Sequence, residues 1–358
     1  MSENTNILAS SMWVGLNFAA TQDRYNGFLA RARPAFAQFI ESWLLHDIVV
    51  VPTDDYLTLT AIVDCLGDRA TIALLESGIL RFLRIRGTLG YVGGGGGVVG
   101  VSFPFKGDGT DASAVGAEVP DAVTWALRGL RVKPDLEVAK QAVQHTTELD
   151  LSIYKDGLAT AAYDDFRQLP FGKELDPRCL PGVTNKQVQI LGGQDLSDTN
   201  DMIQVVLALA TANLELRLMA ESSSTDNATT TPIGHALRAR EIRLGQPHQA
   251  FGELRQLTEV PDIAEAVLSR KLSVDALLEL RNSMAGAAFR SWFHLNCAQD
   301  PSKTTRAYID LLSAVPTAQK KPVKALRFLI TTALGFIPIV GGLVGLPPPQ
   351  SILLWSIR

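Results

Sequence analysis

Four consecutive β-branched residues, Ile48 to Val51, constrain the fold of this chain more than any other feature. β-Branched side chains favour extended backbone, and a short continuous apolar run is typical of a buried strand. Pro52 ends the run, and apolar residues then recur at helical spacing until Gly67. The sequence therefore predicts a buried strand followed by a helix.

The surrounding residues extend this pattern into a small α/β module over residues 1–120. Apolar residues over 22–45 have helical spacing, and Pro34 is expected to divide them into a helix pair. Residues 80–86 read as a second strand. Five glycines, Gly93 to Gly97, separate two further short apolar runs, which predicts a hairpin with a glycine-rich turn.

Residues 121–319 predict a helical domain. The clearest helix covers residues 201–221, and the polar run 222–231 is expected to be a mobile surface loop. Asp262 and Ser273 stand where side chains that cap helix N-termini are preferred, and a long helix is expected over residues 274–292. The predicted fold class is α+β and predominantly helical, with the strands in the N-terminal module.

The last part of the chain, residues 320–358, differs from the rest. All 37 acidic residues precede Lys320, and residues 328–346 carry no charge. This length can cross a membrane once, and a basic flank favours the cytoplasmic leaflet. Pro338 and several glycines weaken a straight helix, which favours burial of this segment in a helical domain over membrane insertion. The residues expected to contact a membrane or partner are Lys320, Lys321, Lys324, Arg327, Phe328, Leu329, Phe336, Ile337 and Ile339.

Overall composition excludes several classes of protein. A net charge of −4 opposes general nucleic-acid binding, which requires a concentrated basic surface. The three cysteines have no spacing typical of a disulfide framework or zinc site, and residues 1–18 do not resemble a secretory signal. We expect a cytoplasmic location, with association with the inner face of the membrane through the C-terminal segment.

Asp54, Asp55 and Asp64 are the candidate metal ligands. Carboxylates that follow a strand can bind a divalent cation, as phosphodiester chemistry requires. The structural alternative is that Asp54 and Asp55 cap the following helix while Asp64 is a solvated surface group. The adjacent pair His46–Asp47 could also form a catalytic dyad with Cys65 or a serine, although adjacent strand residues point to opposite faces.

Two further patterns favour structural roles. Gly95, Gly97 and Gly100 match the spacing of a dinucleotide fingerprint, but a strand rather than a helix follows them, so no cofactor is expected. The segment from Arg281 to His294 mixes aromatic and basic residues that could stack on bases, but an amphipathic helix that packs its aromatic face into the core fits better.

Three functions follow from these patterns. The first is a non-enzymatic protein, such as a bacterial effector, that binds a partner or membrane through its apolar C-terminal segment. The second is a metal-dependent enzyme acting on nucleotide or phosphodiester substrates. The third is a structural module whose C-terminal segment mediates homo-oligomerisation.

Overall fold

The computed structural model describes residues 5–12, 28–86, 89–91, 101–103, 117–128, 130, 133–150, 212–229, 248, 250–252 and 262–297. The predicted C-terminal segment and the glycine run 93–97 lie outside these residues. The described part is predominantly helical and contains a parallel five-stranded sheet, in agreement with a mixed, mostly helical fold.

The sheet has the order β6-β3-β2-β1-β7. Its strands are β1 (Asn6–Leu8), β2 (Ile48–Thr53), β3 (Leu80–Arg86), β6 (Thr146–Asp150) and β7 (Asp226–Asn227). Every neighbouring pair is parallel, and Ile7 of β1 is in register with both Val49 and Asp226. All six residues of β2 are buried, which confirms the predicted central strand.

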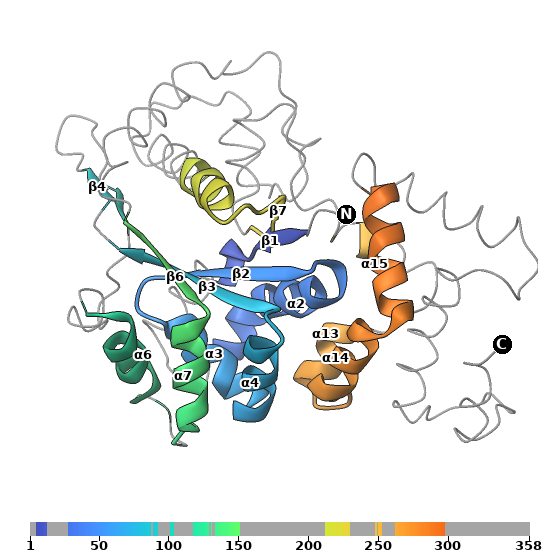
Figure 1. Cartoon of the computed structure of the whole chain (residues 1–358), viewed down its shortest axis with the longest axis horizontal. Helices are drawn as coiled ribbons and strands as arrows, with labels where there is room; N and C mark the ends of the chain where they lie inside the picture. Colours follow the sequence, from blue (N-terminus) through green and yellow to red (C-terminus); the bar gives the residue numbers. More distant parts are fainter. Residues whose placement is uncertain are drawn as a thin grey trace, which may run out of the picture.

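The helices cover the sheet in the way that right-handed crossovers require. Figure 1 shows α2 (Phe28–Leu45), α3 (Leu57–Leu66), α4 (Asp68–Glu76), α6 (Val119–Arg128) and α7 (Leu136–Gln144) on one side of the sheet and the helix over 212–221 on the other. From β1 to β2, from β2 to β3 and from β3 to β6, the chain moves each time to the next strand in the same direction across the sheet. Right-handed crossovers between these parallel strands therefore lie on the same face.

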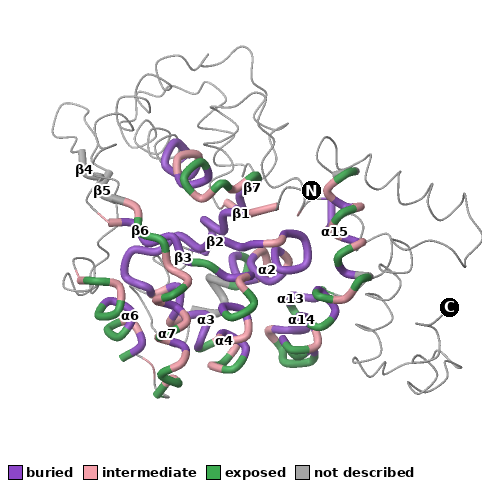
Figure 2. Tube along the Cα trace, in the orientation of Figure 1, coloured by how far each residue is buried: buried purple, intermediate pink, exposed green. Residues whose placement is uncertain are grey.

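The C-terminal helices pack beside α2. These are α13 (Ile263–Leu268), α14 (Val274–Asn282) and α15 (Met284–Cys297); α13 and α15 contact α2, and α14 contacts α4. The buried aromatic residues Phe36, Phe39, Trp43, Phe82, Phe289 and Phe293 belong to one core. Figure 2 shows that β2 is buried along its length and that the C-terminal part of α2 is largely buried. The aromatic face of α15 therefore packs in the core, as expected.

Several local predictions are confirmed. β4 (Leu89–Tyr91) and β5 (Val101–Phe103) pair in antiparallel fashion, as the hairpin prediction requires. Asp262 caps α13 by accepting a hydrogen bond from the amide of Glu265, and Ser273 caps α14 by accepting one from the amide of Ala276. These signals are local, so the sequence alone reveals them.

Two helix predictions were wrong. α2 continues through Pro34, which is exposed and removes only one early intrahelical bond, so there is no helix pair. The helix expected over 274–292 divides at Ser283, whose side chain accepts a hydrogen bond from the amide of Gly286 and so begins α15.

The strands are not confined to residues 1–120, because β6 and β7 lie beyond them. The prediction of a mobile loop over 222–231 was also wrong in part. Asp226, Asn227 and Ala228 are buried, and Asp226–Asn227 form the edge strand β7. Polar composition predicted a loop, but here the polar side chains bond to one another inside the protein.

Candidate active site

The carboxyl ends of the parallel strands form the first polar region of the structure. The chain steps from β1 through β2 and β3 to β6 and then returns to place β7 on the other side of β1. Such a reversal is a topological switch point, and open α/β sheets bind their ligands outside the carboxyl ends of the strands at this point. The residues that follow β1, β2 and β7 are therefore the candidates for a ligand-binding site.

The bend after β2 is built from Asp54, Asp55 and Tyr56, which are all buried. The amide of Asp55 donates to Asp54 Oδ1 at 2.9 Å, and the amide of Leu57 donates to Asp55 Oδ1 at 3.0 Å. Asp55 therefore satisfies one first-turn amide of α3, which agrees only in part with the capping alternative, because the N-cap position is Tyr56, whose side chain makes no cap bond. The same carboxyl group also faces the sheet edge beside a second carboxylate.

Tyr56 adopts a backbone conformation that is unusual for an aromatic residue. Its φ of 60° lies in the left-handed region, which costs a non-glycine residue about 1–3 kcal/mol and is often found at functional sites. Surrounding bonds hold it there: its amide donates to Thr53 Oγ1 at 2.9 Å, and its hydroxyl donates to Thr146 Oγ1 at 3.1 Å. Burial raises the pKa of Tyr56 to about 12, so its phenol stays protonated.

The pKa of Asp55 is raised from 3.8 to about 7. Burial is the largest cause, since it disfavours the charged form, and the negative charge of Asp54 adds to it. A carboxyl group with this pKa exists in both protonation states near neutral pH. It can therefore donate or accept a proton without a large energetic penalty, as general acid–base catalysis requires.

A buried arginine supports this bend from β3. The guanidinium of Arg84 donates to Glu148 Oε1 at 3.0 Å and to the backbone oxygen of Asp54 at 3.4 Å. It also lies 5.6 Å from the centre of the Tyr56 ring, within the range of a cation–π contact. Arg84 thus joins the ends of β2, β3 and β6.

A second buried network joins the ends of β1 and β7 at the switch point. Ser10 Oγ donates to Asn227 Oδ1 at 2.7 Å, and Asn227 Nδ2 donates to Glu215 Oε2 at 2.8 Å. Thr229 Oγ1 donates to the same carboxylate oxygen at 2.7 Å. Ser11 Oγ is buried and has no hydrogen-bond partner among the described residues. This network provides hydroxyl, amide and carboxylate groups at the ends of β1 and β7.

The structure brings together two of the three predicted metal ligands. Asp54 and Asp55 are adjacent at the carboxyl edge, whereas Asp64 is exposed about 10 Å further along the axis of α3. Asp64 lines a separate cleft of about 570 Å³ between the α3–α4 turn and the start of α14. Within the described residues, no three histidine, cysteine or acidic side chains are placed to hold a metal ion.

The predicted dyad does not form. Asp47 accepts hydrogen bonds from the amide and hydroxyl of Thr5, and His46 lies at the amino edge of the sheet, opposite the acidic bend. Burial raises the pKa of the Cys65 thiol to about 12, so its nucleophilic thiolate form is disfavoured.

Sequence reasoning missed Ser10, Tyr56, Arg84, Glu215 and Asn227. The pair Ser10–Ser11 directly after an apolar triplet was a weak signal for a residue at a strand end. The other four carry no local signal, because their roles depend on contacts between distant parts of the chain.

Comparison of the chain with protein family models, with curated proteins and with solved structures found no match. Among the described residues, no helix has both the length and the apolar character needed to span a membrane.

Proposed function

We propose that this chain is an enzyme that transfers a proton to or from a small, neutral, hydroxyl-bearing molecule, of the nucleoside or sugar class, at the carboxyl edge of its sheet. The observation that carries the proposal is the Asp54–Asp55 pair, in which the pKa of Asp55 is raised to about 7 at the end of a central parallel strand. Asp55 is the proton donor or acceptor.

The chemistry of the edge favours a neutral substrate. Asp54, Asp55 and Glu215 supply negative charge, and the buried guanidinium of Arg84 is engaged by Glu148. A phosphate group would be repelled unless a divalent cation accompanied it. Hydroxyl groups, by contrast, form hydrogen bonds to carboxylate, amide and serine oxygens without a charge penalty.

The dimensions of the edge also suit a small molecule. Neighbouring strands lie about 4.8 Å apart, so the ends of β2 and β7, which β1 separates, lie roughly 10 Å from each other. A nucleoside or a monosaccharide spans this distance. Asp55 would act at one end of the molecule and the Ser10–Asn227–Glu215 network would orient the other.

The test is a binding experiment with matched ligands. The four ribonucleosides, their monophosphates with and without Mg²⁺, and a set of hexoses are titrated calorimetrically against the full chain, its Asp55→Asn variant and an Asp64→Asn control. We expect a nucleoside or hexose to bind without Mg²⁺, and Asp55→Asn to weaken binding by about tenfold or more, which corresponds to about 1.4 kcal/mol. The Asp64 control should bind normally.

Two outcomes overturn the proposal. Binding of monophosphates alone, and only with Mg²⁺, would support a metal-dependent enzyme acting on nucleotides or phosphodiesters. Equal binding by the Asp55 and Asp64 variants would remove Asp55 from the site.

The sequence favours a second candidate function through a separate observation. Residues 328–346 carry no charge and follow the basic residues Lys320, Lys321, Lys324 and Arg327, a pattern that suits contact with an anionic membrane or an apolar partner surface. Liposome co-sedimentation of the full chain beside a version ending at Thr317 tests this role. Equal recovery in the supernatant would count against the membrane.

A further inference from the structure

Three histidines from separate parts of the chain meet at the amino edge of the sheet. His46 lies in the turn between α2 and β2, His294 lies on α15, and His248 is a helical residue that precedes the described helical residues 250–252. The His46 ring centre lies 5.0 Å from that of His294 and 6.2 Å from that of His248. We call these residues the histidine cluster.

His46 is the most unusual member, because it is fully buried and neither ring nitrogen has a hydrogen-bond partner among the described residues. An unsatisfied buried polar group costs about 1–3 kcal/mol. The nearest acid is Asp226 of β7, whose Oδ2 lies 3.8 Å from His46 Nε2.

The other two histidines are bonded to the end of α2. His294 Nε2 contacts the carbonyl oxygen of Leu45, and His248 Nε2 lies 3.2 Å from that of Gln38 and 3.1 Å from Ser42 Oγ. A carbonyl oxygen only accepts, so each Nε2 donates its proton. These bonds hold both rings against α2.

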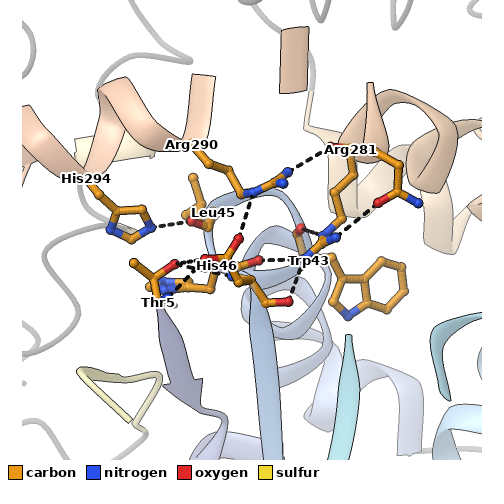
Figure 3. Close-up of polar contacts among 9 residues, drawn as sticks. Thr5, Trp43, Leu45, His46, Arg281, Arg290 and His294 are labelled. Carbon is orange, nitrogen blue, oxygen red and sulfur yellow. Dashed lines mark hydrogen bonds and ion pairs between the residues drawn. The ribbon is translucent and has the colours of Figure 1, made fainter. Parts of the chain in front are cut away.

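Two arginines complete the attachment of the C-terminal helices to α2. Arg281 of α14 donates to the carbonyl oxygens of Trp43, His46 and Asp47 at 2.6, 3.0 and 2.6 Å. Arg290 of α15 donates to the carbonyl oxygen of Arg281 at 2.8 Å and lies 3.4 Å from Asp47 Oδ1. Figure 3 shows these cations converging on the end of α2 beside His46 and His294. Cations suit this position because helix C-termini carry unsatisfied carbonyl groups.

The charges around the histidine cluster balance only while its rings are neutral. The positive groups are Arg281 and Arg290, and the negative groups are Asp47 and Asp226. A proton added to the fully buried ring of His46 gives this region an excess positive charge where water screens it poorly. Adjacent protonated rings would also repel one another and the two arginines.

The pKa values agree with this account. Burial lowers the pKa of His46 well below its ordinary value of 6.5, and positive charge on His294 or His248 would lower it further. Burial also lowers the pKa of His248, although Asp226 opposes the effect. Both rings are therefore neutral at neutral pH.

We propose that the histidine cluster is a pH-sensitive latch, which holds α15 against the end of α2 at neutral pH and releases it in mildly acidic conditions. Release is favourable there because burial lowers the pKa of His46 and His248 in the packed state, so both rings gain protons more readily once water reaches them. This inference is independent of the proposed enzymatic site at the opposite edge of the sheet.

Hydrogen–deuterium exchange of the full chain tests the latch. Exchange is measured at about pH 7.5, 6 and 5, with correction for the pH dependence of intrinsic exchange. We expect α15 to lose protection by about tenfold or more between the highest and lowest pH while α3 keeps its protection. Loss of protection in α3 and α15 at the same pH would indicate global acid unfolding and overturn the latch, as would unchanged protection in α15.

A double variant, His248→Gln with His294→Gln, provides the specific comparison. The glutamine amide can donate to the same carbonyl groups but cannot gain a proton in this pH range. We expect α15 to lose clearly less protection at the lowest pH in this variant than in the unmodified chain, because only His46 of the cluster can still gain a proton. The control is His145→Gln at the end of α7, outside the cluster, which should behave like the unmodified chain; the same acid response in the double variant would contradict the proposal.

Discussion

Ser10 Oγ donates a hydrogen bond of 2.7 Å to Asn227 Oδ1 across 217 positions of the chain. The bond joins the ends of the neighbouring strands β1 and β7 at the switch point, because Ser10 follows β1 and Asn227 ends β7. Asn227 in turn donates to Glu215, so one buried amide links a hydroxyl group to a carboxylate.

Replacing Asn227 with alanine should therefore destabilise the protein. Ser10 would lose the closer of its two acceptors, keeping the carbonyl oxygen of Ala228 at 3.2 Å, and Glu215 would lose one of its donors while both stay buried. This should cost about 1–3 kcal/mol in the free energy of unfolding. Urea denaturation measures this cost. Thr225→Ala, in the same segment but exposed, should change stability by less than about 0.5 kcal/mol. Equal effects of the two substitutions would mean that the buried network contributes no stability.

The raised pKa of Asp55 predicts a stability difference that depends on pH. Between about pH 4 and 7, the folded state keeps a proton that the unfolded state has released, because the pKa rises from 3.8 to about 7 on folding. The contribution of Asp55 to stability is therefore present at low pH and is lost as the pH rises through this window. Asp55→Asn removes the dependence, since asparagine stays neutral.

Urea denaturation across pH checks this expectation. The stability of Asp55→Asn relative to the unmodified chain should grow as the pH rises from about 4 to 7 and then level off, with a total change on the order of a few kcal/mol. The difference between the two proteins cancels the opposite trend from His46. A flat difference would show that the carboxyl group titrates normally; exposed Asp64→Asn is the matched control.

Arg84 and Arg86 lie on the same strand and both contact Glu148, but their surroundings differ. The side chain of Arg84 is fully buried, whereas that of Arg86 is 32% exposed. Arg84→Met should cost about 2–4 kcal/mol, because it removes the buried bonds to Glu148 and to the backbone of Asp54. Arg86→Met should cost less than about 1 kcal/mol. Thermal and urea unfolding of the pair compares them directly, and a reversed order would contradict the assigned role of Arg84.

The thiol of Cys65 should react slowly in the folded protein. Burial, with a smaller effect from Asp64, raises its pKa to about 12, so the reactive thiolate is scarce near neutral pH. Iodoacetamide labelling followed by peptide mass spectrometry should show that Cys65 is modified at least about tenfold faster in urea than in native buffer. Rapid labelling in native buffer would instead mark Cys65 as an accessible nucleophile.

The sequence predicts the helices and strands of this fold better than it predicts the contacts between them. The strand at Ile48 and the caps Asp262 and Ser273 depend on neighbours within a few residues, so local patterns identify them. β7 consists of polar residues whose partners are far away in the chain, and its composition therefore predicted a loop.

The same distinction applies to the site. Asp54 and Asp55 were singled out because acids follow a strand, but the raised pKa of Asp55 depends on burial by the whole fold. The histidines are dispersed in the sequence, and only the packing of α15 on α2 brings His46 and His294 together. Residues whose roles depend on long-range contacts leave no periodic pattern in the local sequence, so the sequence alone does not identify them.

Gly286 lies where α15 begins beside the end of α14, and its lack of a side chain permits this approach. A Cβ atom at this position would lie closer than van der Waals contact to the carbonyl oxygens of Leu280 and Arg281. The same Arg281 oxygen accepts the hydrogen bond from Arg290. Gly286→Ala should therefore move a carbonyl group that orients α15 and should destabilise the fold by about 2–4 kcal/mol.

Exchange measurements at neutral pH distinguish a local effect from a general one. Because the bond from Arg290 to the carbonyl oxygen of Arg281 is disturbed, α15 of the Gly286→Ala variant should lose protection before α3 does, even without acid. Gly252→Ala is the control, since nothing lies within 4 Å of its added Cβ atom, and it should leave α15 unchanged. Normal protection of α15 in Gly286→Ala would show that the close contact between α14 and α15 does not hold α15 against α2.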